Sequence, residues 1–371
     1  MFRDAVRRFV REEIEPNVDD WEEAGRVPKA LFRRLGKLGF LGVEFPVEYG
    51  GGGGDFWMSV VLAEELARCR AGGVAFSVIV HTDMSSPWLV ALGTDEQKER
   101  YLPGIASGET VCALAITEPG AGSDMAGIST SAVRDGDDWI INGAKTFTTN
   151  GVYGDLYFLA ARTSLEEPRH RGLSQFLVER NTPGITVAGK LEKTGMLSSD
   201  TAEIAFDDVR VPATSLLGEE GRGFYQLASG LQRERLMAAV MSISAADQVL
   251  DDSRVYVRQR EAFGRPLSEM QGLRHKVADM ATRIEAARGL TYHAAARFAA
   301  GEECAKEVSM AKLFATEAAV KVGYDAVQLH GGYGYVRETP VERFARDYRL
   351  WTIAAGSSEI MRDIIAKRVI D

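Results

Sequence analysis

The sequence predicts an α+β protein of more than one domain, in which helical segments enclose a strand-rich segment. Its 371 residues exceed what one simple hydrophobic core usually holds. Apolar residues recur near every 3.6 positions in 1–111 and again in 222–371, whereas 112–221 alternates short β-branched and aromatic runs with turn residues. Domain boundaries are therefore expected at 111/112 and 221/222, with a β-barrel or sandwich as the central domain.

The first segment is expected to be an N-terminal helical domain. Residues 2–14 place apolar side chains at helical spacing, and further helices are expected to begin near Asp55 and near Thr94. Thr94 to Gln97 resembles an N-cap followed by an acid-rich first turn. The run Gly50 to Gly54 is not followed by Gly-Lys-Ser/Thr, so it indicates a turn rather than a phosphate-binding loop.

The second and third segments differ in the period of their apolar residues. Strands are expected in the runs DWIINGAKTFTTN, DLYFLAAR, SQFLVER, GITVAG and TAEIAFDDVRV. Long helices are expected over 222–263, 271–300 and 303–329, which contain few helix breakers. Long antiparallel helices with short connections favour a C-terminal four-helix bundle.

Composition excludes several classes of function. The net charge of −9 argues against nucleic-acid binding, which usually needs a basic face. Cys69, Cys112 and Cys304 form no CxxC pair, and the five histidines form no HExxH motif, so neither a disulfide framework nor a metal site is expected. No apolar run approaches membrane-spanning length, and the acid-containing N-terminus is unlike a transit peptide. A cytoplasmic protein is therefore expected.

Four motifs occur along the chain, and in this order they resemble the signatures of the acyl-CoA dehydrogenase family. They are TEPGAGSD at 117–124, RQREAFG at 258–264, QLHGG at 328–332 and GSSEI at 356–360. The resemblance covers essentially the whole chain. It implies an FAD-containing oxidoreductase of β-oxidation and lipid metabolism that forms a homotetramer as a dimer of dimers.

The same resemblance implies two groups of FAD-binding residues. One group lines the flavin in its own subunit: Leu114, Ala115, Ile116, Thr117, Gly122, Ser123, Phe147, Thr148, Thr149, Ser357 and Glu359. The other reaches the FAD of a neighbouring subunit: Arg260, Phe263, Gln271, Gln328, Gly331 and Gly332. The residue types suit these roles, because glycines let a backbone approach a ligand and arginine bonds two pyrophosphate oxygens at once. Taken alone, they equally fit strand-to-loop turns, an exposed hairpin Phe and a solvated helix-end arginine.

The catalytic base is expected on a helix. Many family members carry a glutamate immediately before the glycine of the last motif, but this chain has Ala355 there. A second family arrangement, typical of the long-chain and isovaleryl types, places the glutamate before an arginine on a helix, and Glu234-Arg235 matches it. A carboxylate in a desolvated slot can remove the weakly acidic α-proton of an acyl thioester. Without that context, Arg233-Glu234-Arg235 would read as an exposed salt-bridge cluster.

Substrate contacts are implied for Ser123, Arg235, Ala355 and Gly356. Alanine keeps its backbone N–H, so Ala355 still offers a hydrogen-bond donor for the thioester oxygen. Phe76, Ser77 and Val80 line either the floor of the acyl pocket or an ordinary helical core.

The expected reaction is α,β-dehydrogenation of an acyl-CoA, with Glu234 taking the α-proton, the β-hydride passing to flavin N5, and electron-transfer flavoprotein as acceptor. Two alternatives stay open. One is a flavin oxidase, monooxygenase or carrier-protein-thioester dehydrogenase on the same fold. The other is a catalytically silent scaffold that binds flavin and acyl-CoA. The motif wording does not decide acyl chain length.

Overall fold

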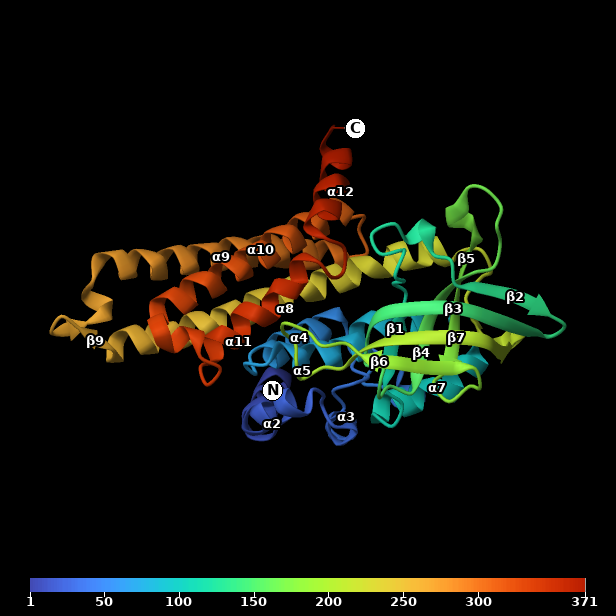
Figure 1. Cartoon of the computed structure of the whole chain (residues 1–371), viewed down its shortest axis with the longest axis horizontal. Coiled ribbons are helices and arrows are strands. Elements are labelled where there is room, and N and C mark those ends of the chain that lie inside the picture. The colour runs from blue at the N-terminus through green and yellow to red at the C-terminus, as the bar shows by residue number, and fades with distance from the viewer. Residues whose placement is uncertain (371) are drawn as a thin grey trace.

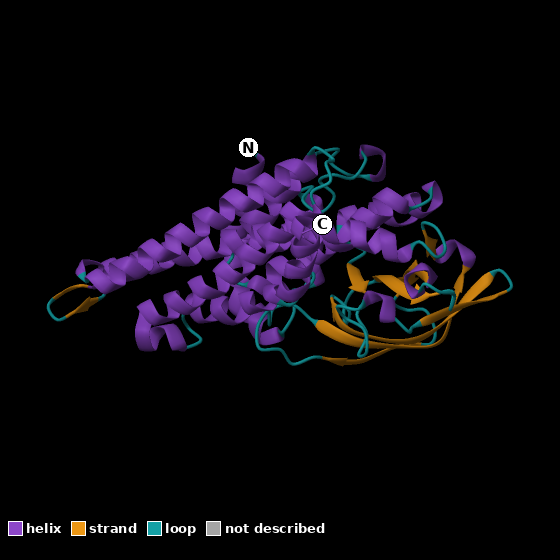
Figure 2. Ribbon diagram, turned by 90° about the horizontal axis from the view of Figure 1, so that it is seen from above, coloured by secondary structure: helices purple, strands orange, loops and turns teal. Residues whose placement is uncertain are grey.

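Two helical parts and one β-sheet part make up the molecule, which confirms the predicted fold class. The computed structural model describes residues 1–370. Helices α8, α9 and α10 run side by side along the long axis of the molecule, and the N-terminal helices α2 to α5 lie beneath them (Figure 1). The β9 hairpin lies at one end of this axis and the sheet at the other (Figure 1). Seen from above, helices and strands are segregated rather than interleaved (Figure 2).

The N-terminal part contains seven α-helices within residues 1–111. They are α1 Phe2–Phe9, α2 Val18–Ala24, α3 Lys29–Lys37, α4 Phe56–Ala67, α5 Gly72–Ile79, α6 Ser86–Leu92 and α7 Asp95–Ser107. Wider π-helical turns, η1 Val10–Ile14 and η4 Val80–Ser85, extend α1 and α5. The Asp55 side chain caps α4, and Thr94 with Gln97 forms a capping box on α7, so both predicted helix starts are confirmed.

The glycine-rich segment after α3 is a turn, as predicted. The N–H groups of Gly51 to Gly54 all donate to carbonyls of residues 42–46. A phosphate loop needs such N–H groups free to point at the ligand. These are already used inside the turn, so they cannot cradle a phosphate in this conformation.

The central part is one eight-stranded sheet with the order β6-β7-β3-β2-β4-β5-β8, and β1 pairs with β4. The strands are β1 Cys112–Ala115, β2 Ser131–Asp135, β3 Asp138–Thr149, β4 Leu156–Arg162, β5 Leu173–Glu179, β6 Ile185–Lys190, β7 Thr201–Pro212 and β8 Leu216–Leu217. Every residue of β4 is buried, because β1 and β5 flank it and its faces are covered. The end strand β6 has no buried residue and alternates between half-buried and exposed positions.

The C-terminal part is a bundle of long helices. Its elements are α8 Gly223–Gln259, α9 Gln271–Ala299, α10 Ala305–His330, α11 Pro340–Asp347 and α12 Ser358–Ile370, with the short hairpin strands β9 Glu261–Ala262 and β10 Arg265–Pro266. The predicted first helix was too long at its end. The helix ends at Gln259 because Arg260 is extended, with φ −78° and ψ 126°, and Phe263, with a φ of 55°, lies in the tight turn between β9 and β10.

One hydrophobic core joins the two helical parts. Side chains from α1, α4 and α5 pack in the same buried cluster as those of α8, α9 and α10. A second cluster joins α6 and α7 to β1, β4, β5 and the start of α8. Leu114 of β1 packs against both clusters, so the end of β1 marks the place where all three parts meet. No helix within the described residues is both long and apolar enough to cross a membrane.

Candidate active site

Glu234 and Arg235 lie in the middle of α8 and are both buried. The exposed fractions of these residues are 4% and 6%, and Arg233 is half-buried, so the alternative of an exposed salt-bridge cluster is wrong. Glu234 Oε1 and Arg235 Nε have no hydrogen-bond partner in residues 1–370. Buried polar atoms are normally paired, so two adjacent unpaired ones indicate a place where a ligand completes the bonding.

The Glu234 carboxyl has the properties of a general base. Burial raises its pKa from 4.5 to about 8, while the Arg235 charge acts in the opposite direction. A base is most effective when its pKa lies near the working pH, because it is then both ionised and strong enough to hold the proton. Among the predicted site residues, Glu234 is the one whose burial and raised pKa suit this chemistry.

The loop before α12 lies against Arg235. A Cβ placed on Gly356 would come within 3.6 Å of Arg235 Nε and Nη2. Ala355 and Gly356 both have positive φ, 54° and 90°, so the chain makes a sharp left-handed turn here. The N–H of Ala355 donates to no carbonyl of the described chain. Arg235 of α8 and Gly356 of this loop, the direct sequence neighbours of Glu234 and Ala355, therefore lie beside each other.

The TEPGAGSD segment continues from β1 and is held by a buried ion pair. Lys145 Nζ lies 2.8 Å from Glu118 Oε1 and 2.9 Å from the Ile116 carbonyl, and the other Glu118 oxygen accepts the N–H of Ser129 at 2.8 Å. Burial acts to raise the pKa of Glu118, but the Lys145 ammonium outweighs it and holds that pKa at about 2. The pair fixes Leu114–Thr117 as a rigid strand end, while Gly122 and Ser123 stay exposed beyond it.

Phe147 lies beside this strand end on β3. The Thr146 N–H donates to the Thr117 carbonyl at 2.8 Å, so the two predicted flavin-lining segments are neighbours. The register of β3 against β7 shifts between Lys145 and Thr148, and within this bulge Phe147 has a φ of 57° and is 68% exposed. Bulges often re-aim a side chain next to an active site. Thr148 and Thr149 are buried.

The second predicted group of FAD residues gathers at the other end of the long bundle. Arg260 ends α8, its guanidinium lies 6.0 Å from the ring centroid of Tyr333, and Tyr256 stacks on His330. Gln328, Gly331 and Gly332 are exposed there, as are Gln271 at the start of α9 and Phe263, which is 97% exposed. The β9 hairpin lies far along the bundle from the sheet (Figure 1). Within one chain, the two predicted groups of FAD-binding residues therefore lie far apart.

The residues expected near an acyl pocket are packed in the helical core. Phe76 makes an edge contact with Trp351 at a ring-centroid separation of 5.0 Å, and Val80 is buried. Ser77 is hydrogen-bonded to Asn150 between α5 and β3. Phe76 thus packs against Trp351, which precedes Ala355 in the chain by four positions.

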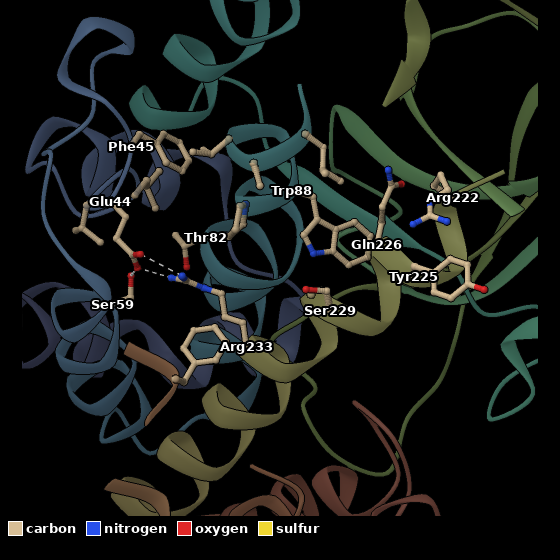
Figure 3. Close-up of a pocket in the computed structure, with 18 of the residues that line it drawn as sticks. Glu44, Phe45, Ser59, Thr82, Trp88, Arg222, Tyr225, Gln226, Ser229 and Arg233 are labelled. Carbon is tan, nitrogen blue, oxygen red and sulfur yellow. Dashed lines mark hydrogen bonds and ion pairs between the residues drawn. The ribbon is translucent and has the colours of Figure 1, made fainter. Parts of the chain in front are cut away.

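A cavity of about 660 Å³ opens on a different face of α8. Figure 3 shows Gln226, Ser229 and Arg233 lining it, and Trp88 lies against the same face of α8, next to Gly230. Positions spaced by three or four residues share one helix face, whereas Glu234 is turned about 100° further round from Arg233. Glu234 does not line this cavity.

The cavity floor is a buried ion cluster. Arg233 bonds Asp83 Oδ1 at 2.6 Å and Glu44 Oε2 at 3.1 Å, and Ser59 donates to Glu44. The dashed lines in Figure 3 mark the Arg233–Glu44 and Ser59–Glu44 contacts. Burial acts to lower the pKa of Arg233, but the charges of Asp83 and Glu44 outweigh it and raise that pKa, so the guanidinium is permanently charged. Sequence reasoning missed this cluster, because its members come from three separate segments.

Lys312 was also missed, although the sequence carried a signal. Val308, Ala311, Ala315 and Ala319 mark the buried stripe of α10, and Lys312 lies on that stripe. A lysine on an apolar stripe is unusual, because lysine is almost never fully buried unless it has a partner. Its ammonium donates to the Gly356 carbonyl at 2.5 Å.

The helical–β–helical fold with a buried carboxylate at Glu234 defines the class as an oxidoreductase of the flavoprotein type, and the comparisons give the family. The family descriptions "Acyl-CoA dehydrogenase, N-terminal domain", "middle domain" and "C-terminal domain" match residues 1–109, 113–209 and 221–370. The chain therefore belongs to the acyl-CoA dehydrogenase family.

Individual relatives agree over the whole length. An acyl-CoA dehydrogenase of Bacillus subtilis is 43% identical, covering 100% of this chain and 97% of its own. The mitochondrial long-chain specific acyl-CoA dehydrogenase of Mus musculus is 42% identical, covering 100% and 86%. The crystal structure of acyl-CoA dehydrogenase from Geobacillus kaustophilus is 45% identical with a TM-score of 0.96, covering 100% and 97%.

The family depends on FAD, and the residues present here fit a flavin. The buried atoms Glu234 Oε1 and Arg235 Nε have no partner in the described chain, and the N–H of Ala355 donates to none of its carbonyls, so a bound group can complete their hydrogen bonding. The rigid end of β1 and the exposed Phe147 are the elements with which this chain can line a planar ring. Among residues 1–370, no group of histidine, cysteine and acidic side chains is arranged to hold a metal ion.

Proposed function

We propose that this enzyme dehydrogenates an acyl-CoA thioester to the trans-2-enoyl-CoA, with Glu234 as the base that removes the α-proton. One observation carries the proposal: the buried, partnerless carboxylate of Glu234 lies next to Arg235, which borders the Ala355–Gly356 turn. Since Ala355 has no carboxylate, the loop supplies only the N–H donor and the helix supplies the base.

The residues divide the work as follows. Glu234 takes the α-proton, and its burial keeps competing water away. The Ala355 N–H donates to the thioester oxygen as enolate charge develops there, and the Arg235 guanidinium adds a positive charge beside the same turn. Bound FAD supplies the acceptor for the β-hydride at N5. Ser123, which is exposed beyond β1, is proposed to contact the substrate.

We infer that the working enzyme is an oligomer, with a dimer of dimers as the expected form. Arg260 follows α8, Phe263 follows β9 and Gln328 lies in the last turn of α10. The β9 hairpin lies at the end of the bundle away from the sheet that contains β1 and β3 (Figure 1). A second copy can bring this group to the pyrophosphate and adenosine part of the first copy's FAD. The exposed aromatic side chains there, Phe263, Tyr333 and Tyr335, support a protein-covered surface.

Anaerobic titration with acyl-CoAs of graded length and branching tests the reaction directly. Flavin absorbance should bleach with at least one class of acyl-CoA, and the class that bleaches it fastest names the substrate. Electron-transfer flavoprotein is the proposed acceptor, so the reduced enzyme should reoxidise far faster with it than with oxygen. Rapid reoxidation by oxygen would favour the oxidase alternative, and flavin that no acyl-CoA bleaches would favour the silent scaffold.

The rate of flavin reduction should depend on pH through Glu234. Because the base must be ionised, kcat/KM is expected to fall about tenfold per pH unit below the free-enzyme pKa of about 8 and to level off above it. The folded carboxyl also binds its proton more tightly than the unfolded one, whose ordinary pKa is 4.5. Its contribution to stability is therefore full below pH 4.5 and is lost as the pH rises through about 8. A kcat/KM that is flat from pH 6 to 9 would contradict the assignment.

A further inference from the structure

Lys312 is a fully buried lysine that donates a hydrogen bond to the Ala355–Gly356 turn. It projects from α10, and its Nζ lies 2.5 Å from the carbonyl oxygen of Gly356. A lysine that only stabilised the fold would be expected to pair with a carboxylate. Lys312 instead donates to a backbone carbonyl in the turn that carries the Ala355 N–H.

The Ala355–Gly356 turn has a strained backbone conformation, so contacts from other parts of the chain are needed to stabilise it. Ala355 has a φ of 54°, which an alanine adopts only at a cost in free energy, and Gly356 follows with a φ of 90°. The segment lies between the short helix η10, Tyr348–Thr352, and α12, and neither helix includes it. Strained conformations persist only where neighbouring contacts fix them, and the Lys312 bond fixes the direction of the Gly356 carbonyl.

We propose that Lys312 is a positioning residue, which holds the Ala355–Gly356 turn in the conformation that presents the Ala355 N–H to the thioester oxygen. The proposal rests on the proposed function and adds a residue to it. Lys312 touches neither substrate nor cofactor in this account; it acts through the turn. Losing the bond lets Ala355 relax to negative φ, which rotates its N–H away from the oxygen.

Electrostatics around Lys312 agree with this placement. Burial, with the neighbouring Arg235 guanidinium acting in the same direction, lowers its pKa to about 7. The neutral amine that prevails above that pH still carries N–H groups, so it can donate to the Gly356 carbonyl in the range where Glu234 is ionised. Arg235, from the side of α8, supplies the positive charge beside the turn, and Lys312, from the side of α10, supplies the hydrogen bond.

The test compares Lys312→Met with Lys306→Met in the FAD-loaded oligomer. Lys306 is half-buried on the same helix and pairs with Glu307, so its replacement removes one lysine charge without touching the turn. Lys312→Met is expected to lower the rate of flavin reduction about 100-fold, as a misplaced donor does, with little change in the Kd of acyl-CoA. Lys306→Met should leave both unchanged.

A spectroscopic readout separates positioning from loss of fold. Acetoacetyl-CoA has an acidic C2 proton and can ionise when its thioester oxygen is held by a donor, giving an enolate band with the oxidised flavin. We expect a strong band with the wild type and Lys306→Met, and a loss of most of it with Lys312→Met at unchanged FAD content. If Lys312→Met does not fold, Lys312→Gln, which is polar but shorter, is measured in the same way and should show the same direction.

The two possible failures can be told apart. If wild type shows the band and is reduced by acyl-CoA, but both Lys312 variants match it within threefold, this inference is wrong and the proposed function stands. If the wild type itself is neither reduced by any acyl-CoA nor gives the band, the proposed function fails with it.

Discussion

Glu234→Gln is expected to bind FAD and acyl-CoA as the wild type does and to reduce its flavin about 10²- to 10⁴-fold more slowly, which is the usual contribution of a general base. Glutamine keeps the shape of the side chain but cannot take a proton at neutral pH. Because Glu234 makes no hydrogen bond in the described chain through Oε1, the change leaves no protein partner of that atom unpaired. Stopped-flow absorbance under anaerobic conditions measures the rate.

A matched control is Glu285→Gln on α9, which neutralises an exposed glutamate paired only with Arg288. It should reduce its flavin as fast as the wild type. Reduction of Glu234→Gln at the wild-type rate would mean that the α-proton goes elsewhere. A normal rate of reduction with a much weaker Kd would mean that Glu234 binds substrate rather than abstracting a proton.

Arg233→Met should be the most destabilising single change near the site. It removes the cation from Asp83, whose side chain is fully buried, and from Glu44. Breaking a buried ion pair from one side costs about 3–5 kcal/mol, because the remaining charge has lost both water and its partner. Denaturant unfolding at equal protein concentration measures the loss, since the stability of an oligomer depends on concentration.

Arg210→Met provides the comparison. Arg210 also bridges two carboxylates, Asp135 and Asp138, but its side chain is 53% exposed, and exposed pairs contribute about 0–1 kcal/mol. In an Asp83→Leu background the further loss from Arg233→Met should shrink, because the buried charge has already gone. Equal losses for Arg233→Met and Arg210→Met would show that the cluster does not stabilise the join between η4 and α8.

Local sequence signals were enough for the fold. The sequence predicted the start of α4 at Asp55 and the start of α7 at Thr94, because helix capping depends on a few adjacent residues. The end of α8 was misjudged because Glu261 and Ala262 are ordinary helix residues. The helical path ends at Arg260, whose φ and ψ of −78° and 126° are extended, and the chain then turns back at Phe263-Gly264, where φ is 55° and 76°. The boundaries at 111/112 and 221/222 stay predictions.

The site was predictable where chemistry depends on residue type. Glu234 followed from an alanine at one position and a carboxylate at another, and its burial agrees with the role proposed for it. Contacts between distant segments were not predictable. Lys312 and Gly356 are separated by 44 positions in the sequence, and Arg233 and Glu44 are separated by 189 positions. Contacts over such separations produce no periodic pattern in the sequence, so they could not be predicted. The left-handed conformation of Ala355 had no signal either, because alanine rarely adopts it.

The central claim, that a carboxylate on α8 removes the α-proton, is tested most directly by proton abstraction uncoupled from hydride transfer. 3,3-Dimethylbutyryl-CoA has α-hydrogens but no hydrogen on its β-carbon, so it can lose a proton and cannot reduce the flavin. Incubated in D₂O and followed by mass spectrometry, it should gain deuterium at C2 with the wild type and gain it at least about 100-fold more slowly with Glu234→Gln. Equal incorporation with both proteins would contradict the assignment of Glu234 as the base.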